Sequence, residues 1–164
     1  MAARAATLHI FCGKIAAGKS SLANEIAASS GGILLSEDHF LSRLYPGGIR
    51  TLDDYVRSAT RLREAIGPCI QEMLRAGIDV ILDFQGNTPR FRAWMRSLIA
   101  ESGSDHLLHY LRATDTVCRA RLCARNAAGN HPYLVSDSDF DLFNSYFVEP
   151  STEEGFKTVI HDQI

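Results

Sequence analysis

The stretch that most constrains this chain is residues 13–21, which read Gly-Lys-Ile-Ala-Ala-Gly-Lys-Ser-Ser. They match the pattern G-x-x-x-x-G-K-[ST], a loop whose backbone amides surround a phosphate group. The two fixed glycines let the backbone turn tightly and approach a ligand without a Cβ in the way. The residues that we expect to contact a nucleotide are Gly13, Lys14, Ala16, Ala17, Gly18, Lys19, Ser20 and Ser21.

Two side chains of this loop and its flanks support that prediction. Lys19 brings a mobile positive charge to the β- and γ-phosphates, and the Ser20 hydroxyl is a ligand for Mg²⁺. Residues 7–12 are short, apolar and β-prone, whereas residues 22–27 carry apolar side chains at the spacing of one helix face. The partial positive charge at the start of that helix adds to the attraction for phosphate. The motif therefore predicts ATP and Mg²⁺ as the cofactors.

Length, charge and cysteine content narrow the class of protein. A chain of 164 residues is the size of one domain, and its net charge of −2 gives no general attraction to nucleic acid or to an anionic membrane. No segment is apolar enough to span a membrane, and the Ala-rich start lacks the pattern of a signal peptide. The four cysteines have no C-x-x-C spacing, which predicts reduced thiols in a cytoplasmic protein.

Strand-like and helix-like segments alternate along the chain. Short apolar runs at 7–12, 33–35, 79–84, 106–111 and 157–161 have the character of buried strands. Alternation of this kind predicts an α/β fold with a parallel sheet between helices. Because ligands of such sheets bind beyond the carboxyl ends of the strands, polar residues at those ends are the candidates for a site.

Two segments outside the sheet are expected to cover the site. Residues of about 39–77 form a largely helical segment that we place on the side of a phosphate acceptor, and Gly67-Pro68 within it predicts a kink or two short helices. Residues of about 127–137 form a polar excursion between two helices, which we interpret as a lid.

Two aspartates follow strands and can converge on the phosphate loop. Asp38 is the candidate to orient and deprotonate an acceptor hydroxyl, with Glu37 as a neighbouring alternative. Asp38 could instead cap a turn or a helix over 38–44. Asp83 ends an apolar strand and is the candidate carboxylate beside Mg²⁺, although an aspartate that caps a loop would look the same.

Arginines before the proposed lid offer positive charge for a transition state. Arg121 and Arg125 are four residues apart on one helix and so share a face, where two guanidinium groups could hold phosphates. A solvated basic face is the alternative. More weakly indicated for an acceptor pocket are Arg43, Arg50, Asn87, Arg90 and Arg92, while His39 and His131 fit capping or surface roles better.

Taken together, these residues resemble a known family. The chain is similar to small bacterial P-loop kinases grouped as predicted AAA-type ATP-binding proteins, whose relatives include polynucleotide 5′-kinase domains, chloramphenicol phosphotransferase and zeta toxins. The resemblance covers nearly the whole chain. It rests on Gly13 to Ser20, Asp38, Val80 to Asp83, Arg121-x-x-x-Arg125 and the ending around Phe147-Val148-Glu149-Pro150.

The resemblance implies a P-loop NTPase three-layer α/β/α sandwich, similar to nucleoside monophosphate kinases, with five parallel strands in the order 2-3-1-4-5. It also implies that Lys19 and Ser20 lie at the phosphates and Mg²⁺, that Asp38 is the base, and that Arg121 and Arg125 are lid arginines. Polynucleotide kinases carry an arginine shortly after the base, whereas here Leu41 and Ser42 come before Arg43.

The sequence thus predicts one P-loop kinase domain over residues 1–164, which transfers the γ-phosphate of ATP to a hydroxyl of an unidentified small molecule. Two alternatives stay open. One is a 5′-hydroxyl polynucleotide kinase, for which nucleic acid would be the partner. The other is a nucleotide-dependent switch or binding module with slow ATP hydrolysis.

Overall fold

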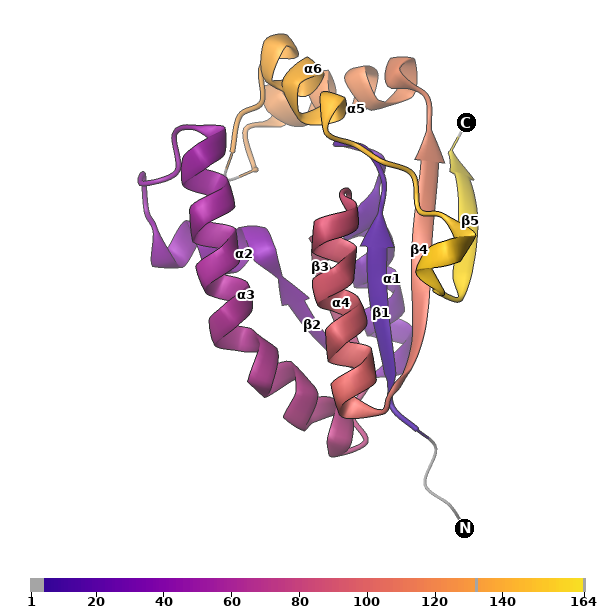
Figure 1. The fold of residues 1–164 in the computed structure, drawn as a ribbon. Coiled ribbons are helices and arrows are strands. Elements are labelled where there is room, and N and C mark those ends of the chain that lie inside the picture. The colour runs from indigo at the N-terminus through magenta and orange to yellow at the C-terminus, as the bar shows by residue number, and fades with distance from the viewer. Residues whose placement is uncertain (1–4, 132, 164) are drawn as a thin grey trace.

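The fold is built on one parallel sheet, as the computed structural model shows for residues 5–131 and 133–163 (Figure 1). Its strands run in the order β2-β3-β1-β4-β5, and all neighbours pair in parallel. Both features confirm the predicted fold. The strands are β1 (Thr7–Cys12), β2 (Ile33–Ser36), β3 (Val80–Gln85), β4 (Asp105–Ala113) and β5 (Thr158–Gln163).

Helices cover both faces of this sheet. In Figure 1, α3 and α4 lie on the near side and α1 lies behind the strands, while α5 and α6 cross the upper end. The bounds are α1 (Lys19–Ser30), α2 (Glu37–Leu44), α3 (Leu52–Arg75), α4 (Pro89–Ser102), α5 (Asp115–Ala128), α6 (Asp137–Ser145) and a short 3₁₀ helix, η1 (Thr152–Glu154). None of the helices in the described ranges is both long and apolar enough to cross a membrane.

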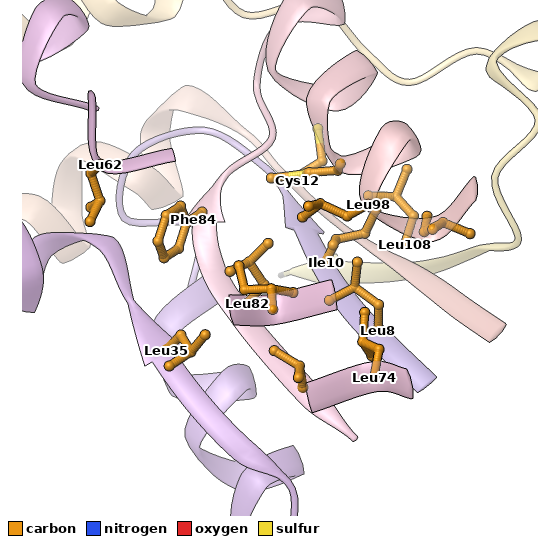
Figure 2. Close-up of a cluster of buried hydrophobic side chains, with 14 of the residues drawn as sticks. Leu8, Ile10, Cys12, Leu35, Leu62, Leu74, Leu82, Phe84, Leu98 and Leu108 are labelled. Carbon is orange, nitrogen blue, oxygen red and sulfur yellow. The ribbon is translucent and has the colours of Figure 1, made fainter. Parts of the chain in front are cut away.

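The hydrophobic core has two parts, because side chains alternate across the strands. Leu8 and Ile10 of β1 join Leu82 of β3 in the larger cluster, beneath α3 and α4. Figure 2 shows these side chains converging with Leu98 of α4. Phe11, the next residue of β1, points to the opposite face and packs in the second cluster with residues of α1, α5 and α6.

The helix starts follow the polar residues that the sequence places there. Thr51 accepts a hydrogen bond from the backbone of Asp54, whose side chain accepts one in return, so α3 begins with a capping box. Thr88 caps α4 through a single hydrogen bond, which it accepts from the backbone of Phe91, and proline occupies the first helical position. Each cap fixes where the helix begins relative to the strand before it.

Around Gly67-Pro68 the sequence predicted a kink or two short helices, and the second of these alternatives is wrong. Pro68 lies inside α3, which continues without a break to Arg75 and changes direction along its length in Figure 1. A proline inside a helix costs about 3 kcal/mol. The buried residues Ile70 and Leu74 beyond it belong to the larger core cluster, and their burial offsets that cost.

One buried arginine fixes the chain between α6 and β5. Arg92 of α4 is 0% exposed and forms two charge-assisted hydrogen bonds with Glu154, at 2.6 and 2.9 Å. Its Nη1 also donates to the carbonyl oxygens of Gly86 and Val148, both at 2.9 Å. Arg92 therefore holds η1 and the preceding segment against α4, which corrects its assignment to an acceptor pocket.

Candidate functional site

A cavity of about 750 Å³ opens at the carboxyl ends of the strands. Its walls come from the phosphate loop, α2, the start of α3, the end of β3, α5 and the chain around 131–143. The cavity has the size of a typical small-ligand site. The predicted site residues on its walls are Ala16, Gly18, Lys19, Ser20, Ser21, Asp38, Asp83, Arg121 and Arg125.

The phosphate loop leaves the first amides of α1 available to a ligand. Gly18 is the N-cap of this helix, with φ of 103°, and provides no side chain to occupy those amides. Ala16 also has a positive φ, of 61°, and so contributes to the tight turn. The backbone N–H of Gly13 donates to Asn87 Oδ1 at 3.0 Å, which ties the loop to the end of β3. This arrangement is suited to an anion.

Lys19 points back over the loop. Its Nζ donates to the carbonyl oxygens of Gly13 at 2.6 Å and of Lys14 at 2.8 Å. Burial lowers the pKa of Lys19, whereas the nearby carboxylates of Asp83 and Asp38 act in the opposite direction. Lys14 lies at the outer side, where its Nζ pairs with Asp115 at the start of α5, at 2.5 Å.

Ser20 and Asp83 form an oxygen-rich pair beside Lys19. Burial raises the pKa of Asp83, and a hydrogen bond with Ser20 and the charge of Lys19 oppose that shift. A hydroxyl and a carboxylate are hard oxygen ligands, and Mg²⁺ is commonly bound by only one or two carboxylates together with substrate phosphates. Among the described residues, no group of three or more His, Cys, Asp or Glu side chains is placed so that it could hold a metal ion.

The neighbouring residues Glu37 and Asp38 have opposite environments. Glu37 is 2% exposed, and its two oxygens accept hydrogen bonds from Tyr55 at 2.6 Å and from Arg63 at 2.7 Å. The side chain of Asp38 is 40% exposed, and its Oδ2 lies 3.5 Å from His131 Nε2. Both carboxylates line the cavity, but only that of Asp38 has an oxygen without a protein partner among those described.

The two arginines of α5 have different neighbours, although both line the cavity. Arg121 donates from Nη1 to the carbonyl oxygen of Ala17 at 3.0 Å and to Gln163 Oε1 at 3.2 Å. Arg125 lies at the Asp38 side, where burial lowers its pKa and Asp38 opposes the shift. Arg125 Nε is buried without a hydrogen-bond partner in the described chain. Arg125 thus lines the cavity but keeps one donor, Nε, inside the protein without a partner in the described chain.

Some cavity residues escaped the sequence analysis. Tyr55 holds Glu37, and Gln163 holds Arg121, although neither residue belongs to a motif. Gln163 is the last residue of the final strand, so its position at a strand end was the available signal. Pro132, within the predicted lid of about 127–137, lies outside the described residues, and the rest of that segment includes the end of α5 and the start of α6.

Residues 8–150 match a family model described as an AAA domain. The chain belongs to this family. Among curated proteins no match was found. The resemblance stated from the motifs is thus confirmed at the level of the family.

Solved structures share the fold. A candidate kinase from Chloroflexus aurantiacus J-10-fl is 22% identical, with a TM-score of 0.76 over 97% of this chain and 86% of the other. Kti12 from Chaetomium thermophilum, solved with ADP-AlF3, is 15% identical, with a TM-score of 0.69 over 94% and 88%. The APS kinase CysC of Mycobacterium tuberculosis, solved with AMPPNP and APS, is 19% identical, with a TM-score of 0.60 over 90% and 84%. The fold is therefore that of P-loop kinases.

Proposed function

We propose that this chain is a Mg²⁺-dependent kinase that transfers the γ-phosphate of ATP to a hydroxyl of a small-molecule acceptor. The observation that carries the proposal is the position of Asp38, a half-exposed carboxylate that lines the same cavity as Lys19 and Ser20. A phosphate loop alone would bind a nucleotide. A free carboxylate in the same cavity adds the group that orients an attacking hydroxyl.

In the reaction, Asp38 accepts a hydrogen bond from the acceptor hydroxyl and takes its proton as the oxygen attacks the γ-phosphorus. The new O–P bond forms as the bond between the γ-phosphorus and the bridging oxygen breaks, and ADP leaves with that electron pair. Lys19 and the first amides of α1 hold the phosphates in position. Ser20 and Asp83 would hold Mg²⁺, which would supply charge neutralisation for the phosphates.

The arginines of α5 have separate tasks in this proposal. Arg125 lines the cavity and offers its positive charge to the transferred group, where negative charge spreads in the transition state. Arg121 binds the carbonyl oxygen of Ala17 and lies close to Gly18, where an added Cβ would be 3.5 Å from Arg121 Nη1. Arg121 therefore supports the phosphate loop and the nucleotide. Arg119 has neither task, because it pairs with Asp137 and Asp141 of α6.

The wall beside Asp38 favours a small molecule over a nucleic-acid strand. Ile49, Leu52 and Tyr55 line the cavity there, and Leu134 faces it from the segment after α5. A groove for a strand of nucleic acid would instead carry a row of basic side chains. Arg50 is the exposed cation on this wall, and its Nε is bound to the carbonyl oxygen of Gly47 at 3.1 Å.

The test is transfer of γ-labelled phosphate from ATP·Mg²⁺ into a pool of hydroxyl compounds. The pool contains nucleosides, sugars, aminoglycosides, chloramphenicol and 5′-hydroxyl oligonucleotides. Asp38→Asn is the test variant, and Asp53→Asn is the matched control, since Asp53 is an exposed carboxylate in the first turn of α3 that does not line the cavity.

We expect label in one small-molecule class, lost in Asp38→Asn and kept in Asp53→Asn. Loss of a general base lowers the rate by a factor of about 10²–10⁴, well above the background of such an assay. Label in the oligonucleotides would favour the polynucleotide kinase. Release of free phosphate alone, at the same rate in Asp38→Asn, would reject the proposal in favour of a switch with slow hydrolysis.

A further inference from the structure

His131 lies between the end of α5 and Tyr133, and it meets Asp38 at the wall of the cavity. Its Nε2 is 3.5 Å from Asp38 Oδ2. Its Nδ1 lies 3.1 Å from the backbone nitrogen of Tyr133 and 3.0 Å from the backbone oxygen of the same residue. The imidazole therefore bridges the chain after α5 and the first turn of α2.

The contact with Asp38 restricts where the ring carries its proton, because the Tyr133 backbone suits either state of Nδ1: its N–H can donate to Nδ1, and its oxygen can accept from Nδ1. An ionised carboxylate can only accept, so Nε2 must carry a proton to bind Asp38. In the neutral ring, Nδ1 then accepts from the Tyr133 N–H. If the ring gains a second proton, Nδ1 can donate to the Tyr133 oxygen instead. Both charge states thus keep a donor directed at Asp38.

We propose that His131 is a positioning residue for Asp38, which holds Oδ2 and leaves Oδ1 free for the acceptor hydroxyl. The distance of 3.5 Å is longer than that of a good N–H···O hydrogen bond, so a small approach of the chain after α5 would complete it. We expect bound nucleotide to bring about this approach, because His131 and Tyr133 line the same cavity as the phosphate loop. The inference rests on the proposed role of Asp38 as the base.

The neighbouring groups are consistent with one donor directed at Asp38. Arg125 contributes positive charge from α5. Burial is the main cause that raises the pKa of Tyr133, and the carboxylates of Asp38 and Glu37 raise it further, so the Tyr133 hydroxyl remains neutral. Glu37 itself is paired with Arg63 and offers His131 no competing acceptor. Asp38 is thus the carboxylate within ion-pair distance of His131 in the described chain.

The first test measures the contact without any acceptor. Long-range ¹H–¹⁵N NMR of the intact protein reports which ring nitrogen carries the proton. We expect the Nε2–H form or the doubly protonated ring for His131, with His39 as the reference because it lies beside Asp38 in sequence but outside the cavity. A neutral Nδ1–H form would overturn the proposal, since Nε2 would then present a lone pair to a carboxylate.

The second test measures coupling to nucleotide, with AMPPNP and Mg²⁺ as the probe. Amide hydrogen exchange over 127–131 is compared in the parent, His131→Ala, His131→Gln and His39→Ala. We expect the nucleotide to slow this exchange in the parent. In His131→Ala the slowing should be roughly threefold to fivefold smaller, which corresponds to the free energy of one partly exposed ion pair. Glutamine, whose amide can reach Asp38, should restore most of the protection, and His39→Ala should resemble the parent. Equal protection in all four would overturn the proposal.

Kinetics with the acceptor that takes label separates positioning from binding. His131→Ala should lower kcat by roughly tenfold and leave the KM for ATP within about twofold, with recovery in His131→Gln. Unchanged kcat would overturn the role in positioning. If the parent transfers no label to any compound, the proposed kinase activity has failed, while the NMR and exchange results still decide whether His131 holds Asp38.

Discussion

The buried pair of Glu37 and Arg63 gives a prediction that separates a structural carboxylate from a functional one. Arg63 is 4% exposed, its Nη2 donates to Glu37 Oε2 at 2.7 Å, and its guanidinium stacks 3.6 Å from the centroid of the Phe91 ring. Arg63→Met keeps an extended apolar side chain against Phe91 but leaves Glu37 buried without its counter-charge. We expect a strongly destabilised protein that still folds.

The magnitude follows from the burial of both partners. Removing one member of a buried ion pair costs about 3–5 kcal/mol, because the other charge is left without compensation. That is a large share of the roughly 5–15 kcal/mol by which a domain of this kind is stable. By contrast, Asp38→Asn changes a half-exposed side chain and should cost less than about 1 kcal/mol. The two neighbouring carboxylates should thus differ severalfold in their contribution to stability.

The cost of Arg63→Met should also depend on pH. Burial raises the pKa of Glu37, and Arg63 is the main cause that opposes the shift, so its loss raises the pKa further. A group with a raised pKa in the folded state binds more protons there than in the unfolded state. The contribution of such a group to the free energy of unfolding is fully present below its pKa in the unfolded state, and it is lost as the pH rises through its pKa in the folded state. The deficit of Arg63→Met should therefore grow from pH 5 to pH 8, by up to about 1.4 kcal/mol per pH unit.

The assay is urea unfolding followed by circular dichroism at several pH values, for the single variants Arg63→Met and Glu37→Gln and for the double variant. In the double variant no buried charge is left unpaired, so most of the loss in Arg63→Met at pH 8 should be recovered. The reasoning would be refuted by a deficit that is the same at every pH and is not reduced in the double variant.

Three further predictions concern the site and its surroundings. Asp83→Ala should weaken Mg²⁺-dependent nucleotide binding at least severalfold in a titration. Because burial raises the pKa of Asp83, nucleotide binding by the parent should weaken in mild acid, and the variant should lack this contribution to the pH dependence. Arg125→Ala should lower kcat by about tenfold or more with little change in ATP affinity, measured by steady-state kinetics. At pH 8, iodoacetamide should label the exposed Cys69 and Cys123 in the native protein but not the buried Cys12. Burial raises the pKa of the Cys12 thiol to about 11, so little reactive thiolate is present, and mass spectrometry of peptides would detect which cysteines are labelled.

Much of the fold could be predicted because local signals and topology agreed. The phosphate loop required a strand before it and a helix after it, and apolar runs of strand length recurred between helical segments. Residue types at Thr51 and Thr88 fixed two helix starts through backbone hydrogen bonds that depend on nearby sequence alone. The strand order came from the family resemblance, since strand pairing is a long-range property.

The errors came from interactions between residues distant in sequence. Arg92 was weakly indicated for an acceptor pocket, but it binds Glu154, which is 62 residues away and which only the folded chain brings close. Pro68 predicted a kink or a division into two helices, yet α3 continues through it because the core beneath α3 outweighs the local cost of the proline. Arg121 and Arg125 do share a helix, but Gln163 and Ala17 draw Arg121 away from the Asp38 side. Sequence spacing gave the helix face, and long-range contacts set where each side chain went.

The choice between Glu37 and Asp38 shows the same limit within two adjacent residues. Ser36 caps α2 by accepting a hydrogen bond from the backbone of His39, so both carboxylates lie in the first helical turn and not in the strand. Successive residues of a helix point about 100° apart. Glu37 is thereby directed to Arg63 and Asp38 to the open part of the cavity. A cap one residue earlier would place Glu37 at the second helical position, which Asp38 now occupies, so the hydroxyl at position 36 helps to determine which of the two carboxylates can meet an acceptor.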